Sequence, residues 1–187
     1  NLSRFAECLI PLIDKDQKKP IEIATDMINS FEKKYEEKWL NMMRDKLGLF
    51  GVEDKDKFLI LDLLTWMHQK KMDYTNTFCH LMNFEIKGKE NFEDNDFKNW
   101  KKRWYERLKI NNNGPEKYTK LMRSVNPLVI PRNHKVEEVL DEANNGNLEP
   151  LNKFLEILDK PYSEQKDIIN FQLPSSSNEK YKTFCGT

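Results

Sequence analysis

Residues 58–67 read FLILDLLTWM, a run that is apolar at nearly every position. A helix that is apolar all round is typical of a protein core, whereas a strand with one solvated face alternates apolar and polar residues. This run, preceded by the acidic Asp54, therefore predicts a central buried helix. It is shorter than the roughly 18 to 20 apolar residues that cross a bilayer, and it contains Asp62, so a membrane span is not expected.

Helical periodicity extends from this run towards the N-terminus. A first amphipathic helix begins at Leu2, and Pro11 is expected to bend or end it. A second helix is predicted from Pro20 to Met42 as one continuous apolar stripe, with Gly48 as its natural stop.

Towards the C-terminus the pattern predicts a short helix over 74–82 and an exposed charged connector over 87–96. The next helix has one apolar face within about 80° of arc at 100° per residue. That face comprises Phe97, Trp100, Trp104 and Leu108.

These patterns predict an all-α protein organised as a single helical region. Residues 1–125 are expected to form a helical bundle and residues 126–160 an extended crossing followed by a helical hairpin, which Asn133 caps. Periodicity fades beyond Pro161, so residues 161–187 are expected to be an irregular tail.

Composition limits the expected partners and the compartment. Lys and Arg total 31 and Asp and Glu total 31, so no net charge attracts nucleic acid or an anionic membrane, and neither is expected as a partner. The 3 cysteines make a poor disulfide framework and indicate a reducing, cytoplasmic setting. Because the chain starts at Asn1 without an initiator methionine, it is expected to be a fragment of a larger protein.

The sequence offers few groups for chemistry. Cys79 and His80 are adjacent and contact one ion only awkwardly, while Cys8, His68 and His134 add no ligand-pair spacing, so no metal site is predicted. A glycine-rich phosphate loop and a nucleophile elbow are both missing from the sequence. We therefore predict no catalytic and no cofactor-binding residue in this chain.

Two charged features leave alternatives open. Arg103 and Arg107 lie one helical turn apart, so they either converge on a phosphate or buried carboxylate or form ion pairs with their stems packed on the tryptophans. The pattern favours ion pairs. Asp62 is either a carboxylate with a perturbed pKa or an ordinary structural partner.

Short motifs along nearly the whole chain resemble the selenoprotein O family. They are NLSRFAE at 1–7, DYTNTF at 73–78, WKKRWYERL at 100–108, NPLVIPRNHKVE at 126–137, PYSEQ at 161–165 and FCGT at 184–187. The family segment like 73–78 is usually followed by arginine, where this chain has Cys79. The motif residues that we expect to be structural are Trp100, Arg103, Trp104, Arg107, Asn126, Pro127, Pro131, Arg132, Asn133, His134 and Glu137.

The resemblance implies a kinase-like enzyme that transfers AMP from ATP to Ser, Thr or Tyr hydroxyls of proteins, with Mg²⁺ or Mn²⁺. It also implies that the ATP-binding and metal-binding residues precede Asn1. This chain would then be the lower helical part of the kinase-like large lobe with a C-terminal extension. Its partners would be the upstream core and, through it, the protein substrates.

Two further points stay open. The alternative function is a stand-alone helical scaffold or adaptor that binds a protein partner through its tryptophan-rich faces.

Cys185 lies third from the end, where animal members of the selenoprotein O family, which this chain resembles, carry selenocysteine. It is therefore a candidate redox thiol, with an idle terminal thiol as the alternative.

Overall fold

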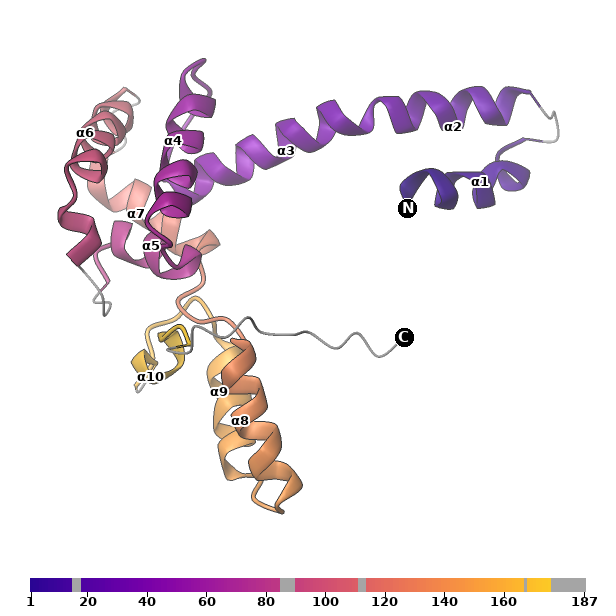
Figure 1. The fold of residues 1–187 in the computed structure, drawn as a ribbon. Coiled ribbons are helices and arrows are strands. Elements are labelled where there is room, and N and C mark those ends of the chain that lie inside the picture. Colours follow the sequence, from indigo (N-terminus) through magenta and orange to yellow (C-terminus); the bar gives the residue numbers. More distant parts are fainter. Residues whose placement is uncertain (15–17, 85–89, 111–113, 167, 176–187) are drawn as a thin grey trace. The chain divides into compact units, whose positions relative to one another are not determined.

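A computed structural model describes residues 1–14, 18–84, 90–110, 114–166 and 168–175 of the chain (Figure 1). Throughout these ranges the regular elements are helices and no strand is present, which confirms the predicted all-α class. The elements are α1 (Leu2–Ile13), α2 (Lys19–Asn29), α3 (Phe31–Lys46), α4 (Asp56–Gln69), α5 (Tyr74–Leu81), the 3-10 helix η1 (Glu90–Glu93), α6 (Asn95–Lys109), α7 (Gly114–Val125), α8 (Asn133–Asn144), α9 (Glu149–Asp159) and α10 (Ile169–Gln172).

The chain divides into two compact units, Asn1–Arg44 and Asp45–Thr187, and the boundary falls within α3. In the first unit α1 and α2 pack against each other as an antiparallel pair. Pro11 does not end α1, which continues to Ile13. Because proline has no N–H, α1 lacks the internal hydrogen bond that residue 11 would otherwise donate to the carbonyl of Glu7.

The predicted continuous helix from Pro20 to Met42 is interrupted at Ser30, between α2 and α3. The Ser30 hydroxyl donates to Met27 O at 2.8 Å, a local bond of the kind that competes with regular helix. The interruption is slight, since Ser30 N still donates to Asp26 O and Lys34 N to Ser30 O. Beyond α3 the chain turns at Gly48, whose positive φ of +69° is the backbone conformation that glycine adopts readily.

The core of the second unit lies between α4 and α6, which pack against each other. The predicted apolar face of α6 is buried, with Phe97, Trp100 and Trp104 at 1–2% exposed. The predicted central helix, α4, is buried on one side only, because Phe58 is 67% exposed and Leu61 40%. The core side of α4 comprises Leu59, Ile60, Leu63, Trp66 and Met67.

The predicted exposed connector over 87–96 contributes to this core. Residues 87–89 lie outside the described part of the chain, but Phe92 is only 5% exposed and stacks on His80 with ring centroids 3.8 Å apart. Asp94 then caps α6 by accepting a hydrogen bond from Asp96 N at 2.6 Å.

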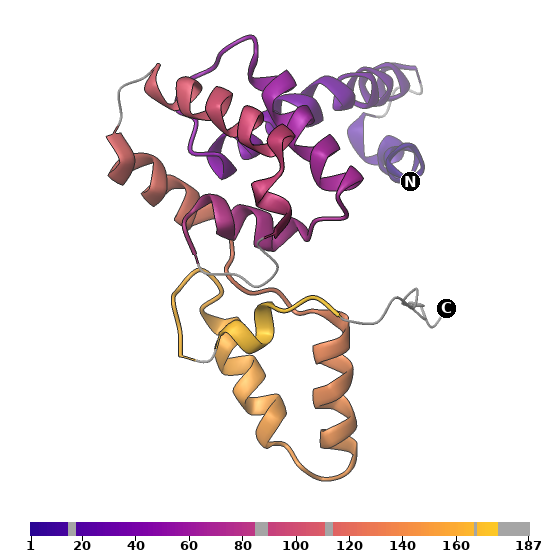
Figure 2. The ribbon, with the colours of Figure 1, turned by 60° about the vertical axis from the view of Figure 1, so that its left-hand side comes forward.

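Helices α8 and α9 form the predicted antiparallel hairpin (Figure 2). Asn133 is not its cap, because it is the first residue of α8, and Arg132 stands at the N-cap position without a side-chain capping bond. The region predicted as irregular contains the one-turn helix α10, whose Phe171 ring stacks on Phe154 of α9. In the described residues no helix has the length and apolarity that a membrane crossing requires.

Candidate functional site

The two tryptophans of α6 donate hydrogen bonds to backbone carbonyls. Trp100 Nε1 donates to Leu59 O of α4, and Trp104 Nε1 donates to Leu47 O just after α3, both at 2.8 Å. The two indole rings are stacked, with centroids 5.8 Å apart and planes 12° apart. A buried indole N–H without an acceptor would be costly, so these bonds fix where α6 lies against α4.

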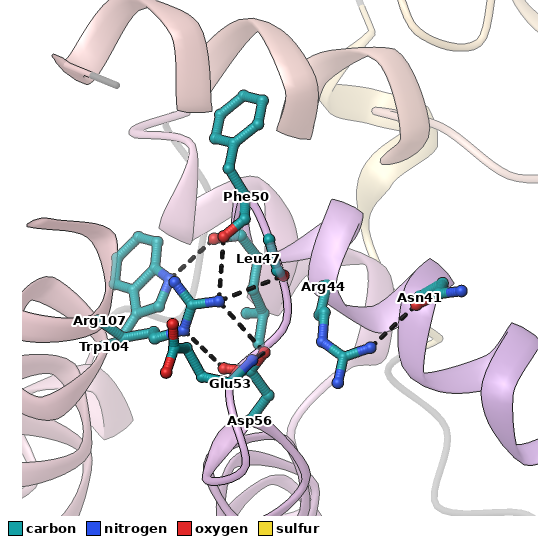
Figure 3. Close-up of polar contacts among 9 residues, drawn as sticks. Asn41, Arg44, Leu47, Phe50, Glu53, Asp56, Trp104 and Arg107 are labelled. Carbon is teal, nitrogen blue, oxygen red and sulfur yellow. Dashed lines mark hydrogen bonds and ion pairs between the residues drawn. The ribbon is translucent and has the colours of Figure 1, made fainter. Parts of the chain in front are cut away.

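One turn further along α6, Arg107 and Asp56 form a buried ion pair (Figure 3). Their side chains are 7% and 0% exposed. Arg107 Nε donates to Asp56 Oδ1 at 2.6 Å, and Nη2 donates to Asp56 Oδ2 at 3.2 Å, a two-pronged geometry that suits the guanidinium fork.

The same pair holds the loop between α3 and α4. Arg107 Nη2 also contacts Phe50 O at 3.1 Å and Gly51 O at 3.3 Å, while Asp56 Oδ2 accepts from Glu53 N at 3.0 Å. Figure 3 shows Phe50 and Asp56 around the guanidinium of Arg107. Arg107 Nη1 is buried and has no hydrogen-bond partner among the described residues. This arrangement orders the loop between α3 and α4 around a guanidinium that is almost fully buried.

Arg103 does not join this cluster. It pairs with Asp62 of α4 at 2.7 Å, and both side chains remain about half exposed, at 56% and 49%. The two arginines thus bind separate carboxylates and do not converge on one anion. Asp62 is the partner in a surface ion pair, a type of contact that contributes at most about 1 kcal/mol.

A second polar cluster lies at the start of the crossing, around Asn126. This residue is 1% exposed, and its Nδ2 donates to Lys46 O and Met122 O, both at 2.9 Å. Its Oδ1 accepts from Lys46 Nζ at 3.0 Å. The ammonium group also lies 4.8 Å from the ring centroid of Phe78, and partial burial lowers the pKa of Lys46.

A third cluster joins the end of the crossing to α5. Arg132 donates to both carboxylate oxygens of Asp73, at 2.7 and 2.9 Å, and reaches Asn76 Oδ1 at 3.4 Å. Asp73 also caps α5 by accepting from Asn76 N at 2.8 Å. Burial alone would raise the pKa of Asp73, but the hydrogen bonds from Arg132 and Asn76 N outweigh burial and lower it.

The cysteines are placed very differently. Cys79 is fully buried beside Pro127 O, and burial, with a smaller effect of the Asp73 charge, raises the pKa of its thiol to about 11. Such a thiol is protonated at neutral pH and unsuited to nucleophilic chemistry. Cys8 is exposed on α1, and Cys185 lies outside the described residues.

The remaining motif residues show no convergence on a reactive centre. Pro131, Asn133 and Glu137 are exposed, while Pro127 and His134 are partly buried. Nowhere in the described ranges do three or more His, Cys, Asp or Glu side chains gather so that they could hold a metal ion.

Sequence reasoning missed several partners that matter in these clusters. Asp73 had a readable signal, since an Asp directly before a predicted helix is a common N-cap. Lys46 and Asp56 had none, because their roles depend on residues 51 or more positions away in the chain.

The fold and these clusters together define a helical module in which two arginine–carboxylate pairs and a buried asparagine order the loop between α3 and α4 and the crossing. The family model described as protein adenylyltransferase SelO matches residues 1–159. The chain belongs to this SelO family.

Curated relatives agree with this membership. A protein nucleotidyltransferase YdiU of Pelagibacter ubique is 53% identical over 188 residues, with 100% of this chain and 39% of the relative covered. Proteins of the same name are 43% identical in Alcanivorax borkumensis over 189 residues and 42% in Clostridium perfringens over 188 residues, again with 100% of this chain and 38–39% of the relatives covered. The chain therefore spans about 39% of the length of the curated relatives that it matches.

Proposed function

We propose that this chain is the non-catalytic helical part of a protein adenylyltransferase, whose active site is built by the portion of the relatives that this chain does not span. The whole enzyme would transfer AMP from ATP to Ser, Thr or Tyr hydroxyls of protein substrates in the cytoplasm. Family membership and the nucleotidyltransferase names of the relatives support the reaction class. The helices described here would be the lower part of a kinase-like large lobe with its C-terminal extension.

The polar clusters support a non-catalytic role for this part. Nucleotidyl transfer resembles phosphoryl transfer in needing cations that are positioned around phosphate oxygens. Within the described residues the buried Arg107 is bound to Asp56 and the partly buried Arg132 to Asp73, and no three His, Cys, Asp or Glu side chains gather where they could hold Mg²⁺ or Mn²⁺. We therefore assign to this chain no step of the transfer and no contact with ATP or its metal.

The observation that carries the proposal is the exposed apolar surface of the first unit. No residue of α1 is buried. Large apolar side chains are exposed along α1, α2 and the first half of α3. They are Leu2, Phe5, Leu9, Leu12, Ile13, Ile21, Ile23, Met27, Phe31 and Tyr35. Soluble domains rarely expose so many large apolar residues unless another surface covers them.

We infer that the rest of the family protein covers these helices. The relatives contain a further portion of more than half their length, which is large enough to do so. An open cleft of ≈ 270 Å³ between α1 and α2, lined by Ile10, Ile21 and Ile28 among others, would accept apolar side chains from that portion. In this arrangement the chain supports the active site from outside by fixing the elements on which it is built.

The alternative, a stand-alone adaptor, would need a docking surface other than the tryptophan-rich faces expected from the sequence. Trp100 and Trp104 are 2% and 1% exposed and bonded to internal carbonyls, so they offer no docking face. The exposed helices of the first unit would remain for a foreign partner. Association with the rest of the same protein therefore decides between the two functions.

The test is to produce this chain and the rest of the full-length protein as two polypeptides and to measure their association. Met27→Asp places a charge on α2 where the wild-type side chain is 62% exposed, so it should weaken association at least tenfold without unfolding the chain. Lys33→Asp is the matched control, because Lys33 is an exposed polar position on α3. Equal affinity of the Met27→Asp and wild-type chains, or no association at all, would contradict the proposal.

A further inference from the structure

Gln172 lies where three segments meet that are far apart in the sequence. Its side-chain Nε2 donates to Leu128 O of the crossing at 2.8 Å. Its main-chain O accepts from Asn76 Nδ2 of α5 at 3.1 Å. The residue is 6% exposed, so both bonds form away from water, where an unpaired amide is costly. Helix α10 is therefore bonded to α5 and to the crossing.

The segment that contains α10 also packs on the hairpin. Phe171 stacks on Phe154 of α9, with ring centroids 5.4 Å apart and planes 14° apart. Gln165 Nε2 donates to Ile157 O and Lys160 O at the end of α9, both at 2.9 Å. Figure 2 shows α10 beside the top of α9, next to the crossing. The same short segment thus contacts the hairpin and the bundle.

Leu128 closes the hairpin into a loop. Its N–H donates to Pro161 O at 2.7 Å, and its carbonyl accepts the bond from Gln172. The chain leaves the bundle at the crossing, passes through α8 and α9, and returns to the residue from which it left. Because the return contacts depend on the segment 161–172, the attachment of the hairpin depends on that segment staying in place.

The centre of the bundle does not use these contacts. Helices α4 and α6 are joined by the bond from the Trp100 indole to Leu59 O and by the Arg107–Asp56 pair, and Trp104 bonds α6 to Leu47 O in the loop between α3 and α4. Local structure in proteins opens in cooperative units of unequal stability, and units with few attachments open first. The hairpin and the bundle centre are therefore candidates for separate units.

We propose that α10 is a conformational clasp that holds the α8–α9 hairpin on the bundle, so that its release frees the hairpin while α4 and α6 stay folded. Arg132, with its paired bonds to Asp73, then acts as the hinge that keeps the start of α8 beside α5.

Hydrogen exchange of the intact protein, read by mass spectrometry, tests the clasp. Gln172→Leu keeps a similar volume and removes the donor to Leu128 O, and Phe171→Ala removes the ring that stacks on Phe154. Both variants should speed amide exchange in α8 and α9 about tenfold and leave exchange in α4 and α6 within about twofold of wild type. Asn170→Ala, at an exposed position of α10, is the matched control and should change neither region.

Two outcomes would overturn the proposal. If α8 and α9 exchange at wild-type rates in both variants, α10 does not hold the hairpin. If α4 and α6 speed up as much as α8 and α9, the hairpin is not a separate unit and α10 is an ordinary part of one cooperative core. The two variants remove different contacts, a hydrogen bond and an aromatic stack, so a shared result is attributable to α10.

Discussion

Replacing Arg107 by Met isolates the contribution of the buried ion pair. The substitution removes a guanidinium that is 7% exposed and leaves the Asp56 carboxylate, which is 0% exposed, with its bond from Glu53 N. Losing one partner of a buried pair typically costs about 3 to 5 kcal/mol, because the remaining buried charge loses its two-pronged bond to the guanidinium. The carbonyls of Phe50 and Gly51 lose a donor at the same time, which adds to the cost.

Urea unfolding followed by circular dichroism measures this loss, and Arg103→Met provides a control on the same helix. Arg103 makes a pair of the same kind, but with half-exposed side chains, so its loss should be below about 1 kcal/mol. The double variant with Asp56→Leu should recover part of the stability that Arg107→Met loses, because it also removes the buried carboxylate that Arg107 bound. The reasoning is refuted if Arg107→Met costs less than about 1 kcal/mol or no more than Arg103→Met.

Three other substitutions or treatments have defined outcomes. Trp104→Ala should cost about 3 to 5 kcal/mol in the same assay, since the side chain is 1% exposed, and a loss below about 1 kcal/mol would argue against its burial. Alkylation of the folded chain should block Cys79 much more slowly than Cys8, because Cys79 is buried with a pKa of about 11, and equal rates by peptide mass mapping would be inconsistent with this. The pKa of Asp73 is lower in the folded than in the unfolded chain, so its contribution is present above the unfolded pKa of about 4 and is lost as pH falls through the folded pKa. The stability difference between wild type and Asp73→Asn, measured from pH 7 downwards, should therefore shrink in acid, and a constant difference would exclude this linkage.

The fold could be predicted wherever a repeating apolar pattern coincides with burial. The stripe from Phe97 to Leu108 was predicted from its helical spacing and is buried. The same logic overestimated the burial of α4, where Phe58 is as apolar as its neighbours but is exposed. Periodicity says which residues share a face, and only the packing of other elements decides how many faces are covered.

The polar clusters were mostly beyond prediction. Arg107 was recognised as a residue for ion pairing, but nothing near it in the sequence pointed to Asp56, which is 51 positions away. Helix α10 was missed because a single turn carries no periodicity, and its place is set by contacts to Leu128 and Asn76. Long-range hydrogen bonds leave no local trace in one sequence, and they decide how the crossing and the hairpin are held.

AMP transfer by separated parts tests the proposed function most directly. The full-length protein, this chain, the remaining part, and an equimolar mixture of the two parts are each incubated with ATP labelled in its α-phosphate, Mg²⁺ or Mn²⁺, and cell extract. We expect label on protein with the full-length enzyme and with the mixture, little with the remaining part alone, and none with this chain alone. AMP transfer by this chain alone would contradict a non-catalytic supporting role. Saturable binding of ATP to this chain with micromolar affinity, a binding free energy of about −8 kcal/mol, would contradict it as well. Full activity of the remaining part without this chain would contradict it equally.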